Sequence, residues 1–412
     1  MTSPSLPETE TPVPVRGRHA RWPWVAALVV VLGGMAAAAW YLNREEPLPA
    51  GVSERDYQRG EQRFREIYGK EPSRLDVLSL LGEVAVADGR DESAVACFRA
   101  IPTGHPRYGL PARLQEAQAF VRLKRAAEAE RSFREYLSHA VRNPSEPQAN
   151  LVAAYKWLTY LLSVELRFEE RKEFLGEMQA RGLADVFDSK QYYFPHLLVW
   201  YTASGSGPLT EFLERTPGDA RLAVALARYR VYEGRLDEAQ ALLEEILRRD
   251  PGDLRAAAAL LECHYEANDW EAFARVLNSL PAYADGEPWL LTRMRGEFAS
   301  HEKRWDVAVL HFEQLLKQDP TDPACHMGLA RAYGELGRDA DRDEMQKRSL
   351  VLADIRVGLV NVTEDAPEAC VELAAACDRI GLPEAAETFQ RHAARIRRAK
   401  DAAPSSGAPA QL

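Results

Sequence analysis

One spacing of small, apolar and proline residues recurs along this chain and limits the folds that it can adopt. A small residue is followed by Gly seven positions later and by Ala five positions after that. Large apolar residues stand four and then three positions further on, and Pro follows after another five. The full copies are Gly82, Gly89, Ala94, Phe98, Ile101 and Pro106, and Ala227, Gly234, Ala239, Leu243, Ile246 and Pro251. Partial copies start at Ala117, Gly296, Ala330 and Ala374.

This spacing predicts a hairpin of two antiparallel helices. The small residue and the later Ala let the helices cross closely, because larger side chains would push them apart. The Gly ends the first helix in a left-handed conformation, and the Pro ends the second helix or opens the next hairpin. Ala, Leu, Glu and Arg are strong helix formers and dominate the composition. We therefore expect an all-α chain built as an array of helical hairpins.

The series resembles the tetratricopeptide repeat (TPR) family, whose repeat is about 34 residues long. Gly82 and Ala117 are 35 residues apart, and Gly296 and Ala330 are 34 residues apart. The resemblance covers residues 53–398 and implies a right-handed TPR-like α-solenoid.

Two stretches depart from the repeat. Residues 143–217 lack the series, although residues 155–178 still read as a helix pair, and residues 352–366 add length between two repeats. We expect the array to be interrupted near residues 182–217. The predicted division is a disordered tail (1–21), a transmembrane helix (22–42), a degenerate sub-solenoid (43–217), a second sub-solenoid (218–398) and a disordered tail (399–412).

An uncharged stretch near the N-terminus predicts the membrane helix. Residues 24–42 contain no charged side chain, and a helix of this length nearly spans the hydrocarbon core of about 30 Å. Aromatic residues stand at both ends, where the lipid headgroups lie; they are Trp22, Trp24, Trp40 and Tyr41. The alternative is a cleaved signal peptide with a small-residue cleavage site at residues 37–39.

The charges beside this stretch predict its orientation. Arg16, Arg18 and Arg21 precede it, and Glu45 and Glu46 follow it. Because the positive flank stays in the cytoplasm, we expect a cytoplasmic N-terminus and a C-terminal body outside the cytoplasm. In a Gram-negative-type bacterium, this places the protein in the inner membrane with its body in the periplasm.

Charge and motifs narrow the function classes. The net charge of −10 argues against nonspecific nucleic-acid binding, which needs a positive field. We find no sequence motif for catalysis or for a cofactor, and the five cysteines form no C-x-x-C pair that would suggest a metal site. We expect a protein that is not an enzyme, and cysteines that serve as small buried hydrophobic residues.

The resemblance implies a concave groove, lined by the first helix of each hairpin, in which a protein or peptide partner lies. The residues at the inward positions are Arg122, Arg228, Tyr232, Arg293, His301, Arg331 and Arg379. Arginines bind carboxylates through paired hydrogen bonds, so they favour an acidic partner or a C-terminal carboxylate. The alternative is that these arginines are solvated or pair with local acids such as Glu262 and Glu297.

The sequence therefore predicts a membrane-anchored scaffold that binds a protein partner, in envelope assembly or protein translocation. One alternative is a scaffold or regulator that faces the cytoplasm. Another is an enzyme whose site lies in residues 143–217.

Overall fold

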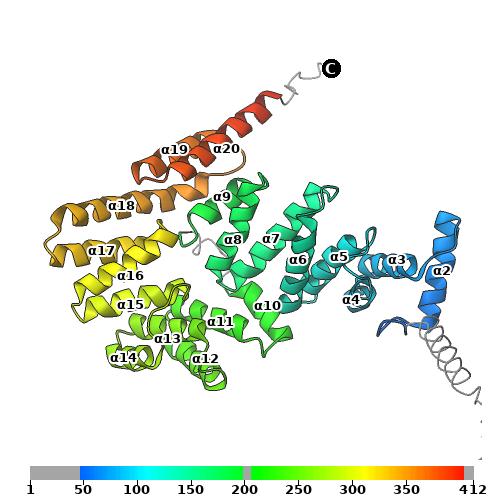
Figure 1. Ribbon diagram of the computed structural model, residues 1–412, viewed down its shortest axis with the longest axis horizontal. Helices are drawn as coiled ribbons and strands as arrows, with labels where there is room; N and C mark the ends of the chain where they lie inside the picture. The colour runs from blue at the N-terminus through cyan, green and yellow to red at the C-terminus, as the bar shows by residue number, and fades with distance from the viewer. Residues whose placement is uncertain (1–46, 198–205, 403–412) are drawn as a thin grey trace, which may run out of the picture. The chain divides into compact units, whose positions relative to one another are not determined.

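The computed structural model describes residues 47–197 and 206–402, which form helices joined by short turns (Figure 1). These ranges hold nineteen α-helices, one 3₁₀ turn and no strand. The first half comprises α2 (Glu54–Tyr68), α3 (Arg74–Ala87), α4 (Asp91–Arg99), α5 (Gly109–Arg122), α6 (Ala126–Ala140), α7 (Gln148–Val164), α8 (Phe168–Ala180), α9 (Val186–Tyr193) and α10 (Gly207–Arg215). The second half comprises α11 (Ala220–Tyr232), α12 (Leu236–Arg249), α13 (Leu254–Glu266), α14 (Trp270–Ser279), α15 (Trp289–His301), α16 (Trp305–Gln318), α17 (Pro323–Glu335), α18 (Asp339–Gly358), η2 (Leu359–Asn361), α19 (Pro367–Arg379) and α20 (Pro383–Ala402).

Consecutive helices pack as hairpins, which confirms the predicted all-α solenoid of TPR-like units. The pairs α3–α4, α5–α6, α11–α12, α15–α16, α17–α18 and α19–α20 are in direct contact. The small residues lie where the helices cross. A Cβ atom on Gly82 would lie 2.5 Å from the ring of Phe98. Cβ atoms on Gly296 and Gly328 would lie 2.7 and 2.6 Å from the ring of Phe312. Any larger side chain would force these helices apart.

The hairpin turns explain why some repeats escape recognition in the sequence. The first helix of a hairpin is followed by one residue with a positive φ angle, and that residue is Gly at residues 89, 234, 337 and 381. The same conformation occurs at Lys124, Leu166, Asn268 and Lys303. A left-handed Leu costs about 1–2 kcal/mol, but Leu166 is 5% exposed and packs in the main core. The pair α7–α8, predicted as helices from residues 155–178, is thus a hairpin without the glycine.

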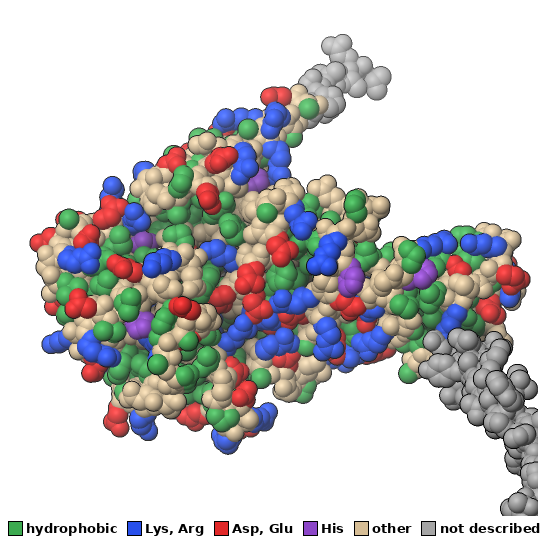
Figure 2. All heavy atoms as spheres, in the orientation of Figure 1, with side chains coloured by type: hydrophobic (Ala, Val, Ile, Leu, Met, Phe, Trp, Pro, Cys, Tyr) green, Lys and Arg blue, Asp and Glu red, His purple; other side chains and the backbone are tan. Residues whose placement is uncertain are grey.

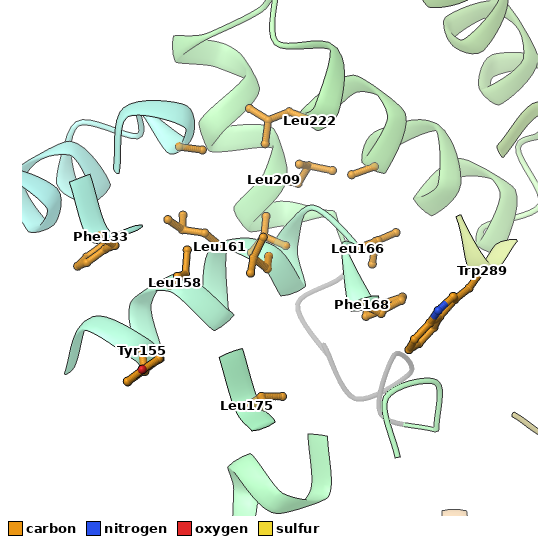
Figure 3. Close-up of a cluster of buried hydrophobic side chains, with 14 of the residues drawn as sticks. Phe133, Tyr155, Leu158, Leu161, Leu166, Phe168, Leu175, Leu209, Leu222 and Trp289 are labelled. Atoms are coloured by element: carbon orange, nitrogen blue, oxygen red, sulfur yellow. The ribbon is translucent and has the colours of Figure 1, made fainter. Parts of the chain in front are cut away.

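The largest hydrophobic core joins both halves of the chain (Figure 3). It includes Phe133, Tyr155 and Phe168 from the first half, together with Trp289 and Phe312 from the second. The described residues from Gly51 onward belong to one compact unit. The predicted division into two sub-solenoids at residue 217 stays a prediction.

The two stretches that depart from the repeat contact each other. Helix α9 lies in the degenerate stretch, and the turn η2 lies in the inserted stretch. Lys190 Nζ donates hydrogen bonds to the carbonyls of Leu359 (2.9 Å) and Val362 (2.8 Å). The backbone N–H of Val186 donates to Glu364 Oε1 at 2.6 Å. Helix α9 therefore packs against hairpins that follow it by more than 160 residues.

The predicted membrane helix and both predicted tails fall largely outside the described residues, so they stay predictions. Within residues 47–197 and 206–402, no helix is both long and apolar enough to cross a bilayer. All five cysteines are free and buried, which confirms their expected role as small hydrophobic residues.

Candidate functional site

The first helices of four successive hairpins carry a row of alternating charges, which we call the ladder. It consists of Arg228 on α11, Glu262 on α13, Arg293 and Glu297 on α15, and Arg331 on α17. Glu262 accepts hydrogen bonds from Arg228 Nε (3.0 Å) and from Arg293 Nη2 (2.9 Å). Glu297 accepts one from Arg331 Nη2 at 3.0 Å. The faces of α11, α13, α15 and α17 that bear these residues form the ladder face.

The electrostatics of the ladder centre on Glu262, which is 2% exposed. Burial alone would raise its pKa, but the guanidinium groups of Arg228 and Arg293 outweigh burial and hold the pKa below its usual value. Arg228 Nη2 also donates to the Tyr232 hydroxyl at 2.7 Å. Burial raises the pKa of Tyr232 to about 12, so this hydroxyl stays neutral. Glu262 is thus an ionised carboxylate shared by two arginines.

The structure brings three of the predicted groove residues together, namely Arg228, Tyr232 and Arg293. The others have separate surroundings. Arg122 pairs with Asp91 at 2.8 Å, and His301 stacks on Trp270 with ring centroids 3.9 Å apart. Arg331 pairs with Glu297 and is half exposed, whereas the exposed Arg379 lines a separate cavity between α18 and α19. That these residues bind a partner stays a prediction.

A cavity of about 320 Å³ opens on the ladder face. It is bounded by α11, α13, α15, the start of α17 and one residue that follows α9. Three carboxylates line it, of which Glu266 is exposed and has no ion pair within the described residues. The residues around the cavity are His196, Val231, Tyr232, Glu262, Glu266, Arg293, Asp322, Pro323 and Ala324.

Next to this cavity, the ladder face is covered by the chain itself. The His196 ring lies between Phe168 and Trp289, with both centroid distances 5.7 Å. His196 Nε2 is 3.3 Å from Asp319 Oδ2. Thr321 Oγ1 donates to the Tyr193 carbonyl at 2.9 Å. Helix α8 and residues 193–197 therefore occupy part of the surface that the repeat pattern assigns to a partner.

A buried charge network fixes α8 beside the ladder face. Arg167 donates to Glu130 (2.6 and 3.0 Å), to Glu165 (2.7 Å) and to Glu170 (2.6 and 2.9 Å). Arg221 on α11 also donates to Glu130, at 2.9 Å. Figure 2 shows Lys and Arg side chains gathered with Asp and Glu side chains in the middle of the drawn face.

Sequence reasoning missed this covering and this network. The segment involved has no repeat motif, and some of its partners stand more than 100 residues away, as Thr321 does from Tyr193. The available signal was the presence of both charge signs at one offset, since Glu262 and Glu297 occupy the same offset as Arg228 and Arg331 in neighbouring repeats.

Comparison with known proteins supports the repeat assignment in one part of the chain. Residues 230–291 match the model of a tetratricopeptide repeat family. No curated protein matches this chain.

Similar solved structures include a MamA mutant, with 19% identity over 40% of this chain and 96% of that chain, at a TM-score of 0.29. A monomeric IFIT1 mutant with Gppp-AAAA has 15% identity over 84% of this chain and 96% of that chain, at a TM-score of 0.34. A tetratricopeptide repeat protein from Parabacteroides merdae has 13% identity over 63% of this chain and 98% of that chain, at a TM-score of 0.31. At such low scores these likenesses carry no functional argument.

Proposed function

We propose that this protein is a membrane-anchored scaffold whose ladder face binds a segment of a protein partner. The supporting observation is the cavity of about 320 Å³ between four first helices, beside the part of the face that α8 and residues 193–197 cover. Its lining mixes ionised groups, a tyrosine and apolar side chains, as sites for protein segments commonly do. We propose binding rather than catalysis, since the charged groups of the ladder are already paired with one another.

We further propose that residues 22–42 anchor the scaffold in the inner membrane and that its body works in the periplasm. The support is the uncharged stretch with its arginine-rich N-terminal flank. Full-length protein should remain with membranes through a carbonate wash, whereas a chain that starts at Pro47 should not. A topology reporter fused after residue 412 should signal a position outside the cytoplasm. A cytoplasmic signal would favour the alternative scaffold that faces the cytoplasm.

The partner site is best tested by site-specific crosslinking. A photoreactive residue replaces Glu266, which is exposed at the cavity and has no ion pair within the described residues. The matched control replaces Arg248 on α12, whose side chain is 67% exposed and lies away from the cavity. Irradiation of intact cells should yield a distinct partner adduct from position 266 and none from position 248. Equal adducts from both positions, or none from either, would contradict the proposal.

Charge reversal of Arg228 and Arg293 is unsuitable for this purpose. Both arginines neutralise the buried Glu262, so reversal would place three carboxylates together. Loss of a partner would then report loss of the fold.

A further inference from the structure

A second, smaller cavity on the ladder face has arginines as its main polar lining. Its volume is about 50 Å³, and it lies between the α7–α8 turn, α11, α13 and the start of α15. Four arginines from three parts of the chain line it, namely Arg167, Arg221, Arg228 and Arg255. Leu166, Val224, Ala258 and Leu290 provide apolar walls. Such walls exclude water and strengthen any ion pair that forms inside.

Two of these arginines retain unused hydrogen-bond donors. Within residues 47–197 and 206–402, Arg255 makes one ion pair, through Nη2 to Glu170. Arg228 uses Nε for Glu262 and Nη2 for Tyr232, and its Nη1 has no hydrogen bond among the described residues. Arg167, by contrast, is saturated by Glu130, Glu165 and Glu170 and serves as a support.

The acids that line the cavity are mostly committed elsewhere. Asp253 caps α13, where its Oδ1 accepts from the backbone N–H groups of Arg255 (2.9 Å) and Ala256 (3.0 Å). Glu169 accepts from the backbone N–H of Trp289 at 2.9 Å. The remaining acid, Glu165, has a side chain only 1% exposed, and its Oε1 has no hydrogen-bond partner within the described residues.

We propose that this cavity binds an anionic oxygen group, a carboxylate or a phosphate, between Arg228 and Arg255, with Glu165 Oε1 as a third contact. The inference deepens the proposed function and rests on it, since a partner segment lying on the ladder face would present the group. A volume of about 50 Å³ holds such a group, because one water needs about 10–15 Å³. Burial raises the pKa of Glu165, which favours the neutral acid over the carboxylate. A proton on Oε1 would let this side chain donate a hydrogen bond to the bound oxygen, while Oε2 keeps its bond from Arg167.

The test compares Arg255→Gln with Arg235→Gln in the full chain in detergent. Both changes remove one arginine that pairs with a glutamate, and the two side chains are 43% and 44% exposed. Only Arg255 lines the cavity. Calorimetric titrations use inorganic phosphate and acetate at constant ionic strength, balanced with chloride.

The expected result is saturable binding by the parent chain and at least a roughly tenfold rise in Kd for Arg255→Gln, since charged bidentate hydrogen bonds are lost. Arg235→Gln should stay within about twofold. If the parent chain binds phosphate but not acetate, the preferred group is a phosphate. If the parent chain binds acetate as well, the preferred group is a carboxylate. An absence of saturable binding, or an equal Kd in the three proteins, would overturn the proposal.

Two controls keep the outcome readable. Glu170 keeps Arg134 and Arg167 as partners in Arg255→Gln, so helix content and the unfolding midpoint should match those of the parent. If the helix content or the unfolding midpoint differs from that of the parent, Arg255→Lys is tested in place of Arg255→Gln. The lysine retains the positive charge but cannot form the bidentate hydrogen bonds, so Kd should still rise. Crosslinking from position 266 is scored separately. If position 266 gives adducts but the chain binds no anion, the anion site is rejected and the scaffold proposal stands. If the chain binds the anion but position 266 gives no adducts, the scaffold proposal is rejected and the anion site stands.

Discussion

The first hairpin and the α8–α9 region are built from the same kind of helix but are stabilised differently. The α3–α4 hairpin makes its main contacts with α2 and α5, its neighbours in sequence. Helices α8 and α9 also contact hairpins far along the chain: Lys172 donates to the Gln318 carbonyl at the end of α16, and Ser189 Oγ lies 2.8 Å from His392 Nε2 on α20. In an ordinary solenoid each repeat contacts only its neighbours. The α8–α9 region adds contacts that couple distant repeats.

The largest expected effect tests the buried network of α8. Arg167→Met leaves Glu130, Glu165 and Glu170 without their shared guanidinium and should destabilise the chain by about 3–5 kcal/mol. Arg90→Met, at an arginine of the first hairpin that is 53% exposed, should change stability by about 0.5 kcal/mol or less. Urea unfolding followed by circular dichroism measures both. Similar midpoints in the two variants would remove the distinction between the regions.

The next effect concerns the contact between α9 and the inserted stretch. Lys190→Met removes two hydrogen bonds from a charged donor to buried carbonyls, at a cost of about 1.5–3 kcal/mol. Hydrogen exchange should speed up in α19 and α20 as well as in α9, since Lys190 holds α9 to the η2 turn that leads into α19, and α9 also contacts α20. The control is Lys317→Met, at an exposed position on α16. If faster exchange stays within α9, this contact does not couple α9 to α19 and α20.

A comparable change in the first hairpin should stay local. Gly82→Ala places a Cβ atom 2.5 Å from the Phe98 ring and should cost about 1–3 kcal/mol. Because α3–α4 contacts mainly its neighbours, faster hydrogen exchange should be confined to α2–α5. Gly104→Ala, which meets no atom within 4 Å, is the control. Increased exchange in α19 after Gly82→Ala would show that the first hairpin is coupled as widely as α9.

The smallest expected effect is a weakening of the contact between α9 and α20 in acid. Burial lowers the pKa of His392, which faces Ser189, Arg391, Arg395, Glu364 and Asp185. The unfolded chain then binds a proton more readily than the fold, so stability falls as pH drops below about 6.5. Protection of α9 and α20 against hydrogen exchange, taken relative to the intrinsic exchange rate at each pH, should fall between pH 7.5 and pH 5.5, and less so in His392→Gln. An equal fall in both proteins would exclude His392 as the cause.

The sequence was informative wherever a structural requirement is local. Gly82, Ala94 and Phe98 identify a hairpin because close helix crossing needs small residues at fixed offsets. The α7–α8 hairpin lacks that signature, since Leu166 occupies the left-handed position and compensates by burial.

The covering of the ladder face depends on contacts between distant residues, and no local pattern records them. Lys190 and Leu359 are 169 positions apart, and neither residue type signals the other. That the inward arginines form one partner-binding series stays a prediction. Arg228, Arg293 and Arg331 pair with Glu262 and Glu297, as the alternative interpretation expected, and this pairing depends on contacts between neighbouring repeats.

The alternating ladder also restricts how many repeats such an array can contain. Glu262 on α13 separates Arg228 on α11 from Arg293 on α15. Loss of the α13–α14 hairpin by an in-frame deletion would keep the helical stacking but remove the buried carboxylate that both arginines share. A duplicated copy of the same hairpin would add a second buried carboxylate without a further arginine on the ladder. Whole hairpins can therefore be gained or lost in this part of the chain only together with charged groups of a neighbouring hairpin.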